Sequence, residues 1–195
     1  MRTKEIYERI SALDGGSVIF ASDFLDMCTE RQAGRVLTDL DEKGIIKRLA
    51  RGIYCKPTAT RFGPLYPSMS EVVEAVARRD HAQTLPSGYT AANMLGFSTQ
   101  VPMTYSFITS GSSRQLTLDG KTINLQRSVP RNFAYSTRLA ALIVQALKAT
   151  GCNNVGKEEL SALKSAIDKN QDKEAFKNDV RMMPIWMKTI IAPLI

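Results

Sequence analysis

The sequence predicts an α+β protein with two domains, a small one of helices and short strands followed by a larger mixed one. A chain of 195 residues is long enough for two small domains or one large one. The spacing of its apolar residues changes repeatedly between the helical period and the alternation of strands. A stretch rich in proline and small residues, PTATRFGPLYP, divides the chain at residues 57–67. We therefore expect domains at residues 1–57 and 68–195, with a linker at residues 58–67.

The first domain is expected to hold five elements. A helix is predicted at residues 3–13, where Ile6 and Ile10 share one apolar face. Residues 17–20 are apolar, as in a short strand, and Ser22 is expected to cap a short second helix. A longer helix and a basic hairpin follow. This order of helix, strand, helix, helix and hairpin is that of a winged helix-turn-helix domain.

The longer helix has both of its ends marked in the sequence. Thr29 is expected at the N-cap, and Gln32 three residues later completes a capping box. Gly44 is expected to end the helix. One face is apolar and is predicted to pack on the domain core through Ala33, Val36, Leu37 and Leu40.

The opposite face of this helix is polar and carries two arginines. Arg31, Arg35 and Thr38 stand at positions i, i+4 and i+7, so their side chains project together from the helix. A helix-turn-helix protein places the N-terminal part of this helix in the major groove of DNA. Arginine forms paired hydrogen bonds with guanine, and glutamine does so with adenine. We therefore predict that base edges are contacted by Arg31, Gln32, Arg35 and Thr38.

A basic hairpin is predicted directly after this helix. From Ile45 to Tyr54 the period becomes that of two short strands with a bend between them. The interval from Lys43 to Arg61 contains no acidic residue and six basic ones. Phosphate contacts set the register that base contacts need, so we expect the wing residues Lys47, Arg48 and Arg51 to bind phosphate. The alternative is a solvated charged surface.

Composition limits the partners and the compartment. The net charge of +7 and the pI near 9.4 are compatible with nucleic acid or with an acidic protein as partner. The three cysteines match no disulfide framework or zinc spacing, so no metal or other cofactor is expected. The N-terminal residues lack a signal-peptide core, and no apolar run is long enough to span a membrane. We expect a cytoplasmic protein.

The second domain is expected to combine a small antiparallel sheet with several helices. Ser68 and Glu71 form a second capping box, and Ser87 is expected to cap a short helix. Asp119-Gly120 is a hairpin signal that would place Leu116 opposite Ile123. Amphipathic helices are predicted from Tyr135 to Gly151 and near residues 156–169, 172–181 and 184–192.

Two features of this domain allow more than one interpretation. The apolar C-terminal stretch MMPIWMKTIIAPLI is expected to pack in the core, or else to form a surface for a partner or a second copy. A set of basic residues can be a second DNA-contacting surface, a face for an acidic partner or a solvated surface; its members are Arg114, Lys121, Arg127, Arg131 and Arg138.

No catalytic residue is expected. His81 is the sole histidine and stands at the end of an amphipathic helix, where a packed or surface role is the usual one. No serine or cysteine has the sequence context of a nucleophile elbow. Gly120-Lys121-Thr122 resembles the end of a phosphate-binding loop, but the motif requires glycine where the chain has Gln115.

Two segments in this order resemble AbiEi-type antitoxins, the repressor half of bacterial type IV toxin-antitoxin systems. The first is GIIKRLARGIY, from Gly44 to Tyr54, and the second is SGYTAANMLGFSTQVP, from Ser87 to Pro102. The resemblance covers roughly residues 3–130. It implies an N-terminal domain that binds the system's own promoter, and a C-terminal domain that opposes a nucleotidyltransferase-type toxin in antiviral defence.

The expected function is therefore that of a sequence-specific DNA-binding transcriptional autorepressor that acts as an antitoxin. The main alternative is a winged-helix adaptor that binds an acidic protein and has no sequence-specific DNA binding. Binding to the DNA upstream of the chain's own gene separates the two. A homodimer is compatible with either function.

Overall fold

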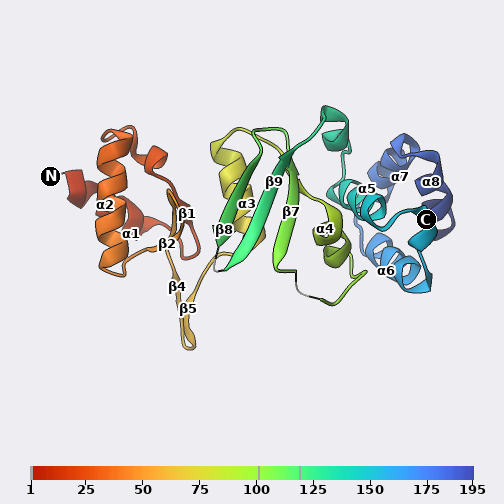
Figure 1. Ribbon diagram of the computed structural model, residues 1–195, viewed down its shortest axis with the longest axis horizontal. Coiled ribbons are helices and arrows are strands. Elements are labelled where there is room, and N and C mark those ends of the chain that lie inside the picture. Colours follow the sequence, from red (N-terminus) through yellow and green to blue (C-terminus); the bar gives the residue numbers. More distant parts are fainter. Residues whose placement is uncertain (1, 101, 119) are drawn as a thin grey trace. The chain divides into compact units, whose positions relative to one another are not determined.

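The computed structural model describes residues 2–100, 102–118 and 120–195, and its fold class is α+β, as predicted (Figure 1). The chain divides into two compact units. The first unit comprises residues 1–76 and 117–120, and the second comprises residues 77–116 and 121–195. None of the helices in the described part of the chain is long and apolar enough to cross a membrane.

The first unit begins with the elements expected from the apolar pattern. They are α1 (Arg2–Ala12), β1 (Val18–Ile19), the 3-10 helix η1 (Ala21–Phe24), α2 (Glu30–Glu42), β2 (Lys47–Ala50) and β3 (Ile53–Cys55). The strands form an antiparallel sheet in the order β1-β3-β2. The helices and this sheet enclose a core that includes Ile6, Ile10, Phe24, Leu37 and Ile46.

The short second helix differs from the prediction. It is a 3-10 helix, and its N-cap residue is Phe20, whose N–H donates to the Asp23 carboxylate at 2.8 Å. Ser22 therefore lies inside the helix instead of capping it. The hydrogen bond from Phe20 to Asp23 thus marks the start of the helix two residues before Ser22.

Residues expected to be a linker form a β-hairpin. β4 (Thr58–Thr60) pairs antiparallel with β5 (Gly63–Leu65), with Thr58 opposite Leu65 and Thr60 opposite Gly63. Gly63 has φ of 114°, a backbone conformation that glycine adopts without a steric penalty. α3 (Met69–Arg79) follows, and its predicted capping box is confirmed because the Ser68 N–H donates to Glu71 Oε2 at 2.6 Å.

The four-stranded sheet is mixed rather than wholly antiparallel. Its strands are β6 (Thr84–Pro86), β7 (Thr104–Thr109), β8 (Arg114–Leu118) and β9 (Lys121–Arg127), in the order β6-β7-β9-β8. β6 runs antiparallel to β7, whereas β7 and β9 are parallel. In the chain β8 comes between β7 and β9, whereas in the sheet β9 lies between β7 and β8. β7 and β9 are therefore neighbours that are not joined by a hairpin. In the expected turn Asp119 lies outside the described residues, and Gly120 has φ of 72°.

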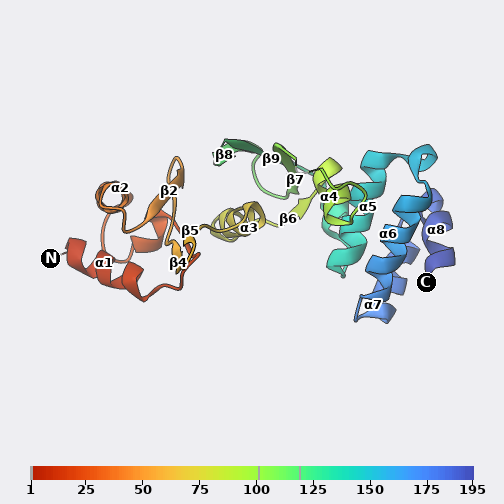
Figure 2. The same ribbon diagram turned by 90° about the horizontal axis from the view of Figure 1, so that it is seen from below.

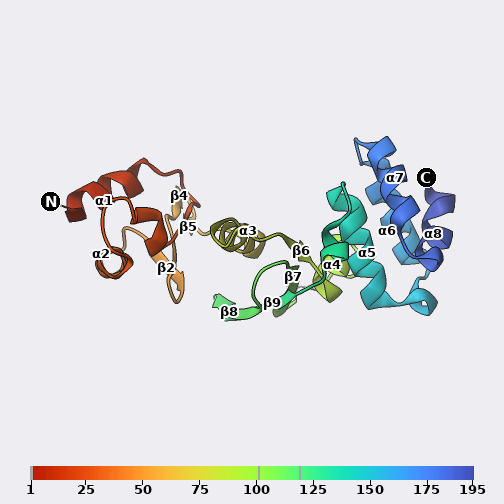
Figure 3. The same cartoon turned by 90° about the horizontal axis from the view of Figure 1, so that it is seen from above.

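The rest of the second unit is helical. Its helices are α4 (Gly88–Met94), α5 (Arg138–Thr150), α6 (Lys157–Asp168), α7 (Lys173–Met182) and α8 (Ile185–Ile191), with 3-10 helices at Pro130–Phe133, Cys152–Asn154 and Ala192–Leu194. Figures 2 and 3 show α5 to α8 packed side by side. Their shared core includes Ile143, Leu147, Leu163, Phe176 and Met187.

The apolar C-terminal stretch is mainly core. Met183, Met187 and Ile191 are buried in the helical core, in agreement with the packing interpretation. Met182 and Ile185 remain exposed on the outer side of the same segment. Ser87 occupies the N-cap position of α4, as expected, but its side chain makes no capping hydrogen bond.

Candidate nucleic-acid interface

Helix α2 has the ends that the sequence predicts. The N–H of Gln32 donates to Thr29 Oγ1 at 3.4 Å, and the N–H of Thr29 donates to Gln32 Oε1 at 3.2 Å, which together form the capping box. Gly44, with φ of 68°, follows the last turn. Ala33 and Leu37 are fully buried, so one face of α2 is held against the core. Its opposite face is consequently turned to solvent.

Arg31 and Arg35 are the exposed cations of this face. Both side chains are exposed, and neither forms a hydrogen bond or ion pair with another residue of the described part of the chain. They stand one turn apart in the N-terminal half of α2, where the helix dipole also contributes partial positive charge. Gly34 lies between them in sequence, and a Cβ there would meet no atom within 4 Å. This end of α2 therefore carries two exposed arginines and one exposed carboxylate, that of Glu30, with open space beside Gly34.

Two other predicted base-contacting residues have interactions inside the protein. Gln32 Oε1 accepts from the backbone N–H of Thr29, and also lies 3.1 Å from its hydroxyl, so Gln32 is engaged in the cap. Thr38 is half-buried; its hydroxyl donates to the carbonyl of Gly34 at 2.9 Å and lies 3.3 Å from Tyr54 Oη. Thr38 thus joins α2 to β3, a contact that the spacing along α2 could not reveal.

The β2–β3 hairpin presents its three predicted phosphate-binding residues at the surface. Lys47 and Arg48 are exposed on β2, and Arg51 is exposed in the turn, where Gly52 has φ of 74°. The backbone N–H of Arg48 donates to Asp41 Oδ1 at 2.8 Å. This bond attaches the hairpin to the C-terminal end of α2, so the two cationic elements belong to one packed body.

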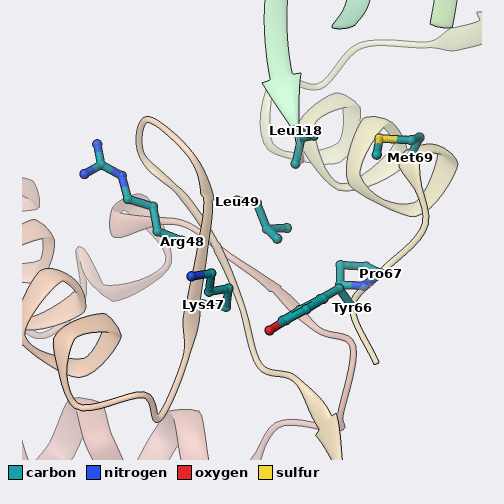
Figure 4. Close-up of a pocket in the computed structure, with 7 residues that line it drawn as sticks. All are labelled: Lys47, Arg48, Leu49, Tyr66, Pro67, Met69 and Leu118. Atoms are coloured by element: carbon teal, nitrogen blue, oxygen red, sulfur yellow. The ribbon is translucent and has the colours of Figure 1, made fainter. Parts of the chain in front are cut away.

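A small pocket lies beside this hairpin, within the first unit (Figure 4). Figure 4 shows Leu49 and Tyr66 turned toward it, while the guanidinium group of Arg48 points away. Its volume is about 170 Å³, below the roughly 300 to 1,000 Å³ that is usual for small-molecule sites. Alternation along β2 places Lys47 on the same side as Leu49 and Arg48 on the other side, and both of these basic residues line the pocket.

Charge is distributed unevenly over these elements. The segment from Lys43 to Ser70 contains no aspartate or glutamate. The C-terminal half of α2 is acidic, with Asp39 and Glu42 exposed and Asp41 bonded to the hairpin. Basic residues without acidic neighbours in sequence are therefore concentrated in the segment that follows α2, and the N-terminal half of α2 adds two arginines and one glutamate.

The family model of DUF6088, a family of unknown function, matches residues 5–175. The chain belongs to this family. The match includes most of both units, so the family comprises the basic N-terminal elements together with the mixed sheet and most of the helices. No curated protein matches the sequence.

The second basic set of this DUF6088 protein is not one continuous free surface. Asp80 forms ion pairs with both Arg79 and Arg114. Arg127 and Arg131 are exposed, whereas Lys121 is half-buried. Arg114 is consequently a structural residue of the second unit.

Burial limits the chemistry of two of the three cysteines in this DUF6088 protein, whereas Cys152 is exposed. Burial raises the pKa of the Cys55 thiol to about 11, because the thiolate would lose its hydration, and Cys28 is also buried. Within residues 2–100, 102–118 and 120–195, no three His, Cys, Asp or Glu side chains are grouped so that they could hold a metal ion.

Proposed function

We propose that the N-terminal elements form a winged helix-turn-helix that binds double-stranded DNA with sequence specificity. In this proposal α2 enters the major groove and the β2–β3 hairpin is the wing on the phosphate backbone. The observation that carries it is the exposure of Arg31 and Arg35 on a helix whose other face is buried. The acid-free segment that follows α2 supplies the sequence-independent attraction.

The spacing of the two arginines suits adjacent base pairs. Residues four apart differ by about 6 Å along a helix axis, and successive base pairs rise by about 3.4 Å. Two extended guanidinium groups on one face can therefore contact bases one or two steps apart. Each paired contact with guanine contributes about 1 to 3 kcal/mol of discrimination. Lys47, Arg48 and Arg51 would set the register by binding phosphate.

We further propose that the protein represses its own promoter and opposes a nucleotidyltransferase-type toxin. This part rests on the resemblance of two segments to AbiEi-type antitoxins, since the family itself has no known function. The first segment corresponds to β2 and β3, and the second to α4 and the loop after it. Asn93 Nδ2 donates to the carbonyls of Ser98 and Gln100 in this segment, at 2.8 and 2.7 Å.

The DNA-binding proposal is tested with the duplex upstream of the chain's own gene and a scrambled duplex of equal composition. At physiological salt we expect the upstream duplex to bind at least about 10³-fold more tightly. Equal affinity for the two duplexes would contradict sequence-specific binding. Absence of binding to either duplex, with retention of an acidic protein, would support an interaction adaptor instead.

The antitoxin proposal is tested by coexpression with the adjacent reading frame. We expect that frame to encode a nucleotidyltransferase whose growth inhibition is relieved by the full-length chain. An Arg31→Ala, Arg35→Ala double variant should still relieve the inhibition if the second unit carries the antitoxin activity. Growth inhibition that is unchanged by coexpression of the wild type would contradict the proposal.

A further inference from the structure

The β4–β5 hairpin carries an exposed aromatic residue next to an arginine at its tip. Phe62 is 86% exposed, the highest value among the large apolar residues of the described chain. The guanidinium carbon of Arg61 lies 4.6 Å from the centroid of the Phe62 ring, a cation–π distance. Arginine thus covers part of the ring and leaves the rest to solvent. We refer to residues 58–65 as the arm.

The tip of the arm has a defined conformation. Thr60 Oγ1 donates to the carbonyl of Gly63 at 2.6 Å and accepts from the N–H of Phe62 at 3.2 Å. Three residue pairs join β4 to β5. Phe62 is therefore held at the end of a short, hydrogen-bonded turn.

The base of the arm is held against the segment that follows α1. The ammonium group of Lys56 donates to the carbonyls of Ser11 and Leu13 at 2.7 and 2.6 Å. A Cβ on Gly15 would lie 2.5 Å from Thr58 Oγ1. The segments around Gly15 and Thr58 therefore approach so closely that only glycine fits at position 15. Figure 1 shows the arm projecting from the body made by α1, α2 and the three-stranded sheet. A fixed base with a projecting tip is suited to insertion into a partner.

Charge indicates what kind of partner. The arm lies in the segment from Lys43 to Ser70, which has basic residues and no acidic ones, and which includes the proposed wing. A polyanion is the complementary surface. Next to Phe62 in the chain are Arg61 and Gly63, and the other exposed large apolar residue of the arm, Leu65, lies at its base opposite Thr58. The tip therefore lacks the apolar centre of a protein interface.

We propose that the arm is a second DNA-contacting element, which places Arg61 in or beside the minor groove and inserts Phe62 between base steps. Apolar wedges of this kind partly unstack DNA and kink it by about 20 to 90°. Arginine next to the wedge neutralises phosphate and suits the negative potential of a narrow minor groove. This inference rests on the proposed function, and it adds DNA bending to it.

The test uses a duplex from the region upstream of the gene, with donor and acceptor dyes at its two ends. We expect the wild type to shorten the distance between the dyes. Phe62→Ala should leave the ends apart and weaken binding on the order of tenfold, without changing the dependence on salt. Phe62→Leu should retain most of the bending, since leucine also serves as a wedge. Arg61→Gln should lower the salt slope by about one unit.

The matched control is Ile185→Ala, which removes a side chain that is 82% exposed on α8. It should change neither affinity nor bending. Both Phe62 variants alter an exposed side chain, so their thermal unfolding should match that of the wild type. If the wild type binds the upstream duplex specifically but Phe62→Ala bends and binds it equally well, the arm inference fails alone. If the wild type binds no duplex, the arm inference and the proposed function fail together.

Discussion

At the scale of single residues, exposure and hydrogen bonding divide the predicted contacts into different roles. Arg31 and Arg35 project from α2 without partners among the described residues. Gln32 and Thr38 are engaged in the cap and in the link to β3. The two arginines are therefore the residues whose removal should affect base preference without affecting the fold.

Arg35→Ala and Arg48→Ala should have distinguishable effects on DNA binding. Loss of Arg35 should relax the preference at one base position and cost about 1 to 3 kcal/mol. Loss of Arg48 should weaken binding to all DNA sequences alike, and should lower the slope of log affinity against log salt concentration by about one unit. Binding is measured over a panel of duplexes and salt concentrations. Arg181→Ala, on the surface of α7, is the charge-matched control, and a uniform loss for Arg35→Ala would contradict its base-contacting role.

Gly34→Ala should stabilise the first unit by about 0.5 to 1 kcal/mol, because glycine inside a helix is less favourable than alanine. The open space beside Gly34 accommodates the added methyl group. Urea unfolding followed by circular dichroism measures the effect. Trp186, the single tryptophan, lies in the second unit. The urea midpoint that its fluorescence reports should therefore be the same in Gly34→Ala as in the wild type.

The control for this substitution is Gly44→Ala, which should destabilise because φ is 68° at that position. Should Gly34→Ala be more stable yet bind DNA more weakly, the glycine is needed for close approach of the backbone to DNA. A destabilised Gly34→Ala protein would show that the helix environment differs from the one described.

At the scale of elements, one buried carboxylate links α7 to the start of α5. Asp179 is 1% exposed and accepts four hydrogen bonds, from the N–H and hydroxyl of Ser136 at 2.9 Å each, and from the N–H and hydroxyl of Thr137 at 2.7 and 2.6 Å. Thr137 in turn caps α5. Burial raises the pKa of Asp179, but the four hydrogen bonds favour the carboxylate and hold the pKa below its ordinary value.

Asp179→Asn should destabilise the second unit by about 2 to 4 kcal/mol, because an amide cannot accept all four hydrogen bonds. The expected readout is the urea midpoint of Trp186 fluorescence at pH 7. Asp168→Asn is the control, since Asp168 forms an exposed pair with Lys164 that contributes little. A midpoint equal to that of the wild type would exclude Asp179 as a link between the helices.

The same carboxylate sets a pH dependence. The pKa of Asp179 is lower in the folded chain than in the unfolded chain, where it is about 4. Its contribution is therefore complete above the unfolded pKa and is lost as the pH falls through the folded pKa. Wild-type stability should decline below about pH 5, and Asp179→Asn should decline less steeply over the same interval. Parallel curves would contradict this assignment.

At the scale of the whole molecule, the proposed function uses a local concentration of charge rather than the net charge. The net charge of +7 comes from the second unit, which has 15 Lys and Arg against 7 Asp and Glu, whereas the first unit has 11 against 12. Four exposed cations of the first unit are assigned to phosphate, namely Lys47, Arg48, Arg51 and Arg61. The slope of log affinity against log salt should then be about −4 for the wild-type chain. A slope near zero would contradict phosphate binding by these residues.

Features that depend on residues close in sequence were predicted better than those that depend on contacts between distant segments. The capping box of Thr29 and Gln32, the burial of Ala33, Leu37 and Leu40, and the α+β class are confirmed. The prediction of Ser22 as the cap of the short helix was wrong, because this helix begins after Phe20 and Ser22 is its second residue. The parallel pairing of β7 with β9 was not predicted, since alternation along a strand does not identify its neighbours.

The sequence alone determined where α2 begins and ends and which of its faces is apolar, because caps and periodicity act within a few residues of each other. Only the tertiary structure decided that Thr38 joins α2 to Tyr54, that residues 58–65 form an arm, and that Asp179 binds the start of α5. Asp179 and Thr38 contact residues that are far away in the chain. Such contacts depend on how the elements pack, and no local pattern encodes them.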